Sequence, residues 1–183
     1  MWEPKEPNPV KYIVGILARD ECCLGAARDA VASQLGPLDL ISDIWPFEKT
    51  DYYRDQTGPA ILRQFISLER LADPGELAQI KHRTNRIEQE LAAMLAGPYP
   101  RPVNLDPGII EPSKLVLATT KNYAHRVYIG AKMYAEVTLV FDRGAWCPLP
   151  YTYPDYRQQT YFDFFSEVRV RLLQQRKSET HEK

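Results

Sequence analysis

The sequence predicts an α+β fold: a ferredoxin-like split βαβ unit (β-α-β-β-α-β) whose antiparallel sheet is extended by a C-terminal β-hairpin and covered by a final helix. Three observations support this prediction. A continuous apolar run opens the domain, a long amphipathic helix with clear start and stop signals occupies its middle, and a hairpin pattern followed by an aromatic helical stripe closes it.

The first half of the chain predicts strand, helix, strand and strand. Residues 10–18 (VKYIVGILA) are nearly all apolar or β-branched, as in a strand buried on both faces. Residues 21–37 are alanine-rich and end in a Gly-Pro pair, which stops a helix. Residues 38–47 and 61–69 are expected to be strands, joined by the polar connection 48–59.

The second half begins with the clearest helix, over residues 73–97. Asp73 is the expected N-cap, Pro74 the first helical residue and Glu76 the capping-box partner, and Gly97 ends the helix. Its expected buried stripe is Leu77, Ile80, Ile87, Leu91, Met94 and Leu95.

A strand over residues 113–120 follows, then a hairpin of 125–129 and 133–141, and then a helix over 160–175. The apolar stripe expected on this helix is Tyr161, Phe164, Phe165, Val168 and Leu172. We therefore expect one domain over residues 10–176, with a disordered leader at 1–9 and a disordered tail at 177–183.

Composition excludes several classes of protein. The chain has 23 basic and 24 acidic residues and a net charge of −1, which argues against a general binder of nucleic acids or anionic membranes. No stretch approaches the roughly 18 apolar residues of a membrane span, and the charged, proline-rich start does not resemble a signal peptide. Three cysteines, two of them adjacent, fit neither a disulfide framework nor a zinc site. We expect a cytoplasmic protein.

The common catalytic motifs are absent. The sequence has no G-x-x-x-x-G-K-[ST] phosphate loop, no G-x-G-x-x-G after a strand and no G-x-S-x-G elbow. His82, His125 and His181 lie far apart without ligand spacing, so we predict no metal site. The sequence identifies neither a reaction nor a cofactor.

The hairpin pattern predicts which side chains share a face. Pairing Ile129 with Met133 keeps apolar residues together, because it sets Val127 opposite Ala135. In that register Arg126 opposes Glu136, Tyr128 opposes Tyr134, and Thr138 lies on the face of Glu136, whereas His125 points to the other face unless a bulge re-aims it. Two interpretations stay open: an ordinary cross-strand ion pair, or a pocket wall in which Arg126 holds a carboxylate or phosphate and Glu136 orients it.

Polar residues also gather before and after the run LVLA at residues 115–118. We expect NLDPG, at residues 104–108, to form a tight turn, because Asp, Pro and Gly each favour turn geometry. Either this is only a turn before a strand, or Asn104 and Asp106 lie beside the sheet edge as ligand contacts. Lys114, Thr120 and Lys121 bracket the strand and are typical of the rim of an anion site.

Two further clusters, KTDYYRD at residues 49–55 and PYTYPDYR at residues 150–157, combine tyrosines with aspartate and arginine. Tyrosines with arginine are favoured at binding surfaces, since they offer large, rigid contact areas. They equally fit tyrosines half-buried over the edge of the core.

The segments WPFEKTDYY, ADPGELAQIKHRTNRIEQELA, VNLDPGIIEPSKLVLATTKNYAHRVYI, YAEVTLVF and TYPDYR together resemble a bacterial family catalogued as domain of unknown function 4416. The resemblance implies a small, single-domain, cytosolic protein without an established activity. Similar sequences are sometimes labelled GTP-binding, but the phosphate loop of ordinary GTPases is missing here. The resemblance supplies no catalytic residues.

The leading functional hypothesis is a protein that binds a small phosphate- or carboxylate-bearing ligand, a nucleotide being one member of that class, in a polar pocket on the sheet. His125 and Glu136 are the candidates for proton transfer. The predicted ligand-binding residues are Asn104, Asp106, Lys114, Thr120, Lys121, Arg126, Tyr128, Asp51, Tyr52, Tyr153 and Asp155.

The alternative is a non-catalytic module that contacts a protein partner through its tyrosine-rich loops. A pocket requires the polar groups to converge in a concavity, whereas a docking module requires a flat patch of tyrosines. Binding of RNA on the sheet is disfavoured, because the charge is slightly negative and the aromatic sheet motifs are missing.

Overall fold

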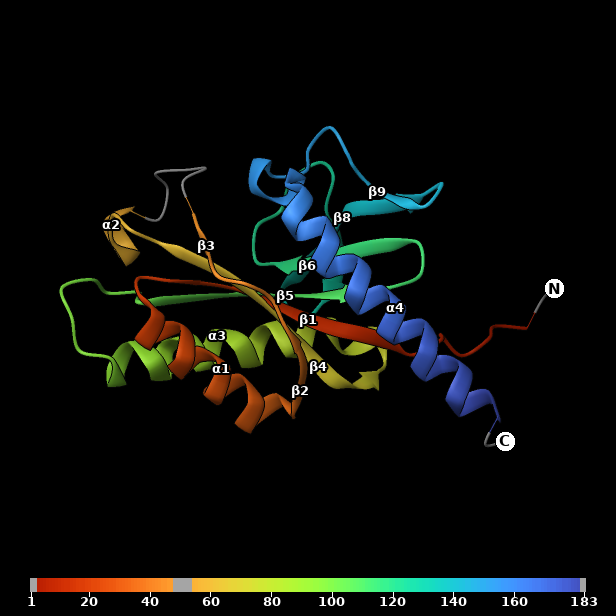
Figure 1. Ribbon diagram of the computed structural model, residues 1–183, viewed down its shortest axis with the longest axis horizontal. Helices are drawn as coiled ribbons and strands as arrows, with labels where there is room; N and C mark the ends of the chain where they lie inside the picture. The colour runs from red at the N-terminus through yellow and green to blue at the C-terminus, as the bar shows by residue number, and fades with distance from the viewer. Residues whose placement is uncertain (1–2, 48–53, 182–183) are drawn as a thin grey trace.

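Strand β1 (Val10–Ala18) is buried along its whole length, as its continuous apolar sequence predicts. The computed structural model describes residues 3–47 and 54–181. In this structure β1 lies between β4 (Leu62–Ala72) and β5 (Val103–Ile110) within a nine-stranded sheet, and the described strand pairs are antiparallel (Figure 1). The fold is therefore α+β, as the sequence predicts.

The strands follow the order β2-β4-β1-β5-β6-β8-β7, with β3 beside β4 and β9 beside β8. The remaining strands are β2 (Leu38–Ile41), β3 (Trp45–Pro46), β6 (Lys114–Thr119), β7 (Val127–Gly130), β8 (Met133–Asp142) and β9 (Ala145–Pro148). The sequence predicts one strand where β2 and β3 lie. They are separate because the Ser42 hydroxyl oxygen accepts the Phe65 backbone N–H at 2.9 Å, in place of a strand carbonyl. Strand β9 was not predicted.

Helices α1 (Glu21–Leu35) and α3 (Leu77–Met94) cover one face of the sheet, where they pack on alternate residues of β1 (Figure 1). Asp73 caps the helical turn η1 (Pro74–Glu76) that leads into α3, by accepting the Gly75 N–H at 2.7 Å. The predicted stripe of α3 is confirmed except at Met94, since Leu77, Ile80, Ile87 and Leu91 are buried and Leu95 is half-buried against the core. Met94 is 66% exposed, because the helix ends there rather than at Gly97.

Helix α4 (Gln159–His181) covers the opposite face. Its predicted stripe is confirmed, since Tyr161, Phe164, Phe165, Val168 and Leu172 are all buried. Phe65 of β4 lies at the centre of this aromatic layer, with its ring centroid 4.8 Å from that of Tyr161 and 5.0 Å from that of Phe165. Edge-to-face aromatic contacts of this kind fix the position of α4 on the sheet. The helix continues past residue 176, where the sequence predicts a disordered tail, and residues 3–9 form no helix or strand.

The prediction of a turn at residues 104–108 is wrong. All five residues lie in β5 and pair with β1, with Asp106 opposite Gly15 and Pro107 opposite Val14. On its other side β5 pairs with β6 only from Gly108 onward. A proline is tolerated in this strand because its missing N–H falls on the side that β6 has left.

The hairpin of β7 and β8 has the predicted pairs Val127–Ala135 and Tyr128–Tyr134. Met133, however, pairs with Gly130 rather than with Ile129, because the register shifts after Tyr128. The two residues that connect the strands, 131 and 132, both have positive φ angles, of 49° and 62°. A two-residue loop in which both residues have positive φ matches the right-handed twist of the two strands of a hairpin.

Gly15 provides a test of how tightly the α4 side of the sheet is packed. A Cβ at this position would lie 2.9 Å from both Arg63 Nη1 and Phe65 Cε1. We expect Gly15→Ala to lower the free energy of unfolding by about 1–3 kcal/mol, measured by urea denaturation, because the core must shift.

Gly25, within α1, is the matched control, since the nearest atom to an added Cβ is 3.8 Å away. Gly25→Ala should be neutral or stabilising by up to about 1 kcal/mol. Equal stability of the two variants would contradict the close packing around Gly15.

Candidate functional site

The candidate site opens where β5 and β6 separate. The last pair between these strands is Gly108–Leu117, and beyond it their ends diverge around a cavity of about 550 Å³. Loops from the hairpin side and the turn before α4 complete the walls. The described residues that line the cavity are Phe47, Arg63, Lys81, Arg101, Asn104, Asp106, Leu117, Ala118, Thr119, Thr120, Lys121, Tyr123, Arg126, Glu136, Tyr153, Pro154, Asp155 and Tyr156.

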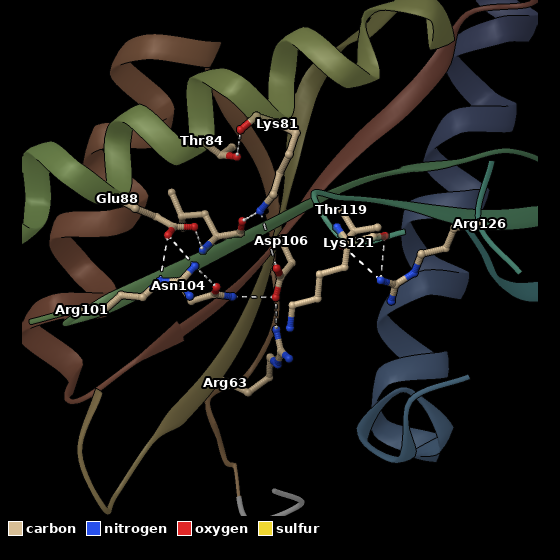
Figure 2. A network of polar contacts seen from close by, with 11 residues as sticks. Arg63, Lys81, Thr84, Glu88, Arg101, Asn104, Asp106, Thr119, Lys121 and Arg126 are labelled. Atoms are coloured by element: carbon tan, nitrogen blue, oxygen red, sulfur yellow. Dashed lines mark hydrogen bonds and ion pairs between the residues drawn. The ribbon is translucent and has the colours of Figure 1, made fainter. Parts of the chain in front are cut away.

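Where the strands separate, backbone groups of β5 have no partner on β6. Side chains from α3 form hydrogen bonds with these groups instead. The Leu105 N–H donates to Glu88 Oε1 at 2.7 Å, and Lys81 Nζ donates to the Leu105 carbonyl at 2.7 Å. Unpaired buried backbone groups are costly, so these two side chains replace β6 along this part of β5. Figure 2 shows both reaching from α3 to the same stretch of β5.

The Glu88 carboxylate also fixes Arg101 at the pocket wall. Arg101 donates to Glu88 Oε2 through Nε at 3.0 Å and through Nη2 at 2.7 Å, and it also donates to the Asn104 side-chain oxygen. Burial raises the pKa of Glu88, although Lys81 and Arg101 oppose this effect. An acidic group on a largely apolar helix face thus positions a cation for the pocket.

Asp106 is the central carboxylate of the pocket (Figure 2). Its Oδ2 accepts from Asn104 Nδ2 at 2.7 Å, whereas Arg63 Nη1 and Lys81 Nζ each lie 3.8 Å from a carboxylate oxygen. Those two distances are too long for hydrogen bonds. The carboxylate is therefore surrounded by donors but hydrogen-bonded by only one of the described residues.

Arg63 is a fully buried cation at the back of the pocket. Its Nη2 donates to Asp155 Oδ2 at 2.9 Å, and its guanidinium lies over the rings of Phe47 and Tyr156, at 5.1 and 5.6 Å from their centroids. Burial disfavours its charge, but Tyr156, Asp155 and Asp106 outweigh this and raise the pKa of Arg63. Its Nε and Nη1 and the Tyr156 hydroxyl have no hydrogen-bond partner among the described residues.

Arg126 forms the opposite side of the pocket with Glu136. Arg126 Nε lies 2.7 Å from Glu136 Oε2, and both side chains are almost fully buried. The guanidinium also donates to the Lys121 carbonyl at 3.1 Å and to the Tyr153 hydroxyl at 2.8 Å, and it lies 4.7 Å from the centroid of the Tyr123 ring. Glu136 lowers the cost of burying Arg126, which in turn orders the β6–β7 loop.

A model of the family described as Domain of unknown function (DUF4416) matches residues 8–171. The chain belongs to this family. The match includes every described residue that lines the pocket. No curated protein and no solved structure matches the chain.

The pocket brings together most of the site residues predicted for this family member from its sequence. Those that line it are Asn104, Asp106, Thr120, Lys121, Arg126, Glu136, Tyr153 and Asp155. The predicted ion pair of Arg126 with Glu136 is confirmed, as is the position of Thr138, whose hydroxyl lies 3.3 Å from Glu136 Oε1.

Other predicted residues lie elsewhere. Lys114 is at the far end of β6, where it pairs with Glu111 at 3.0 Å. Tyr128 is 58% exposed and packs against Tyr134 outside the pocket. Asp51 and Tyr52 lie outside the described residues.

His125 does not line the pocket, but the expectation that it points away from Glu136 is wrong. Its Nε2 lies 3.3 Å from Glu136 Oε2, and its ring stacks on Tyr151 with centroids 4.2 Å apart. His125 is in the turn before β7, so the alternation of side chains along a strand does not apply to it.

Sequence reasoning missed Arg63, Lys81 and Arg101. Lys81 and Glu88, spaced seven residues apart, lie on the buried face of α3 together with Leu77 and Leu91. This polar interruption of an apolar stripe was the available signal. Among the described residues, no three His, Cys, Asp or Glu side chains are grouped so that they could hold a metal ion. None of the helices in the described part of the chain has the length and hydrophobicity of a membrane span.

The raised pKa of Glu88 predicts a pH effect. The folded protein binds the Glu88 proton more tightly than the unfolded chain does. The contribution of this group to stability is therefore fully present at a pH below about 4.5, its ordinary pKa, and is lost as the pH rises through the folded-state pKa. We expect Glu88→Gln to gain stability relative to the unchanged protein as pH rises toward neutrality, measured by urea denaturation at several pH values.

Glu90→Gln is the control, because Glu90 is exposed on the same helix. The gain in stability with rising pH should be larger for Glu88→Gln than for this control. A stability difference for Glu88→Gln that does not change with pH would contradict the raised pKa of Glu88.

Proposed function

We propose that this protein binds a small anionic ligand, bearing a phosphate or carboxylate group, in the pocket between the ends of β5 and β6; nucleotides belong to this ligand class. The observation that carries the proposal is the convergence of five basic side chains on one cavity. Three acidic side chains line the cavity with them and Glu88 pairs with Arg101, so these described residues carry one more positive charge than negative. The basic residues are Arg63, Lys81, Arg101, Lys121 and Arg126.

The arrangement of the cations supports binding rather than a purely structural network. A structural network of buried charges pairs its members fully. Here Arg63 keeps two nitrogens without a hydrogen-bond partner among the described residues, and its ion pair with Asp106 is long, at 3.8 Å. This leaves unused donor capacity at the wall of the cavity.

The shape and lining of the cavity favour an organic ligand. Its volume of about 550 Å³ is within the range of small-molecule sites, roughly 300–1,000 Å³. Aromatic side chains from three segments line it beside the charges, namely Phe47, Tyr123, Tyr153 and Tyr156. Such walls accept the carbon skeleton of a ligand while the cations hold its anionic group.

The same geometry disfavours the docking-module hypothesis. A docking surface requires the tyrosines to form a flat patch, but Tyr123 and Tyr153 line the cavity and both contact Arg126. Within the proposal Glu136 positions Arg126. The proton-transfer roles of His125 and Glu136 stay predictions.

We also propose that β1, α1, β2, β4, α3 and β5 form a ferredoxin-like split βαβ unit in a cytoplasmic protein, with β5 in the place predicted from the sequence for the strand at 113–120. The order β2-β4-β1-β5 and the location of α1 and α3 on one face support the topology. Three free cysteines, one of them exposed, suit a reducing compartment.

Lys114, the first residue of β6, and Lys121, two residues past its end, provide a matched test. Lys121 is exposed at the pocket rim, whereas Lys114 lies outside the pocket, so both can be replaced without opening the core. Calorimetric titration with inorganic phosphate and with a nucleoside monophosphate should show binding to the unchanged protein. Lys121→Ala should weaken it roughly tenfold or more, the value of a charge-assisted hydrogen bond, and Lys114→Ala should leave it unchanged.

The proposal fails if neither probe binds to the folded protein. It also fails if the two substitutions weaken binding equally, because the anion would then be attracted by overall charge and not held in the pocket.

A further inference from the structure

One carboxylate oxygen on the hairpin side of the pocket is shared by two basic side chains. Arg126 Nε lies 2.7 Å from Glu136 Oε2, and His125 Nε2 lies 3.3 Å from the same oxygen. The Thr138 hydroxyl lies 3.3 Å from the other oxygen, Oε1. Glu136 is therefore paired with the permanent charge of Arg126, and it forms a second ion pair when the imidazole of His125 is protonated.

The members of this cluster differ in their access to solvent and to the pocket. Arg126 and Glu136 are each 2% exposed, whereas the side chain of His125 is 26% exposed. His125 can thus exchange a proton with water while it touches a buried carboxylate. Arg126 and Glu136 line the cavity and His125 does not. A change of charge on His125 therefore reaches the pocket through Glu136, without contact between His125 and a ligand.

Two tyrosines hold the ring of His125 in this position. The ring stacks on that of Tyr151, with centroids 4.2 Å apart and planes 14° apart, and it lies parallel to the ring of Tyr123 at 6.1 Å. The titratable groups that face His125 are therefore Glu136 of β8, Tyr151 of the loop after β9 and Tyr123 of its own loop. Tyrosine is uncharged near neutral pH. The charge that acts on the imidazole is that of Glu136, with Arg126 on the same carboxylate oxygen.

We propose that His125 is a positioning residue that makes anion binding in the pocket depend on pH, because its protonated ring shares the charge of Glu136 with Arg126. This inference rests on the anion site proposed above. When His125 is neutral, Arg126 and Glu136 together carry no net charge. When His125 is protonated, the three side chains carry one positive charge at the wall of the pocket. Affinity for an anion therefore rises as the pH falls through the range in which histidine titrates, between about pH 5 and 8.

The coupling between the proton and the anion is reciprocal. If a proton on His125 strengthens anion binding by some factor, a bound anion strengthens proton binding at His125 by the same factor. Saturation of the pocket with an anion should therefore move the midpoint of the His125 titration to higher pH. A residue that only supports the loop would show no such shift.

The first arm of the test compares the unchanged protein with His125→Gln, by calorimetric titration with inorganic phosphate from about pH 5.5 to 8. Glutamine keeps an N–H that can donate to Glu136, but it does not titrate. Phosphate itself titrates in this range, so the readout is the affinity of the unchanged protein divided by that of the variant at each pH. This ratio should be at least ~3-fold larger at the acidic end than at the basic end.

His82→Gln is the matched control. His82 is exposed on α3, where its Nε2 lies 2.6 Å from the Ala131 carbonyl oxygen, and it does not line the cavity. The increase of the affinity ratio toward acidic pH should be smaller for this variant than for His125→Gln.

The second arm needs no variant. The ring protons of His125 and His82 are followed by NMR as the pH is changed, with and without saturating phosphate. The midpoint of the His125 titration should rise on binding by more than that of His82.

The outcomes separate this inference from the anion site. Loss of affinity by the same factor at every pH in His125→Gln would overturn the inference and leave His125 as a support of the loop. Equal affinities of the two proteins at every pH, or a His125 midpoint that phosphate does not move, would also overturn it. In these cases phosphate still binds and the anion site stands. Failure of phosphate to bind the unchanged protein at any pH would overturn the anion site itself.

Discussion

The pocket depends on two side chains of α3 that hydrogen-bond the backbone of β5 where β6 no longer pairs with it. Leu105 would lose both backbone hydrogen bonds at this edge, but Glu88 accepts its N–H and Lys81 donates to its carbonyl. Two residues further on, Pro107 has no N–H to satisfy. The strands can therefore separate inside a buried sheet with the Leu105 N–H and carbonyl satisfied, and this opening is the cavity.

The side chains that hydrogen-bond the β5 backbone also place charged groups at the site. Lys81 and Glu88 are buried on α3, and Glu88 holds Arg101 at the wall of the pocket. On the other face of the sheet, Gly15 leaves room for the Arg63 guanidinium, which approaches Asp106 and Asp155. Arg63, Lys81, Arg101 and Arg126 each have an acidic neighbour, so the fold tolerates a dense set of buried charges around the pocket.

Much of the fold can be predicted from the sequence because its signals are local. The apolar run of β1, the cap at Asp73 and the aromatic stripe of α4 each follow from neighbouring residues. The stretch 104–108 was misread as a turn for the same reason. Asn, Asp, Pro and Gly favour turns locally, and only the tertiary pairing with β1 makes them a strand.

Site residues can be predicted from the sequence when charged side chains lie next to the ends of strands. Those that interrupt an apolar pattern inside a helix or strand are missed. Arg126 and Glu136 follow from the expected hairpin register, and Lys121 follows from its position just after the strand that contains LVLA. Lys81 and Arg63 come from a helix and a strand that each read as plain core elements, and their partners lie at least 24 residues away. Hydrophobic periodicity reports only on neighbouring residues, so it does not predict such long-range pairs.

The most direct test of the anion site is a crystal structure of the protein soaked with tungstate, a phosphate analogue that is located by its anomalous scattering. We predict a peak in the pocket between the ends of β5 and β6, within hydrogen-bond distance of Lys121 Nζ. Tungstate bound only at crystal contacts, with none in the pocket, would contradict the central claim that this opening of the sheet is an anion-binding site.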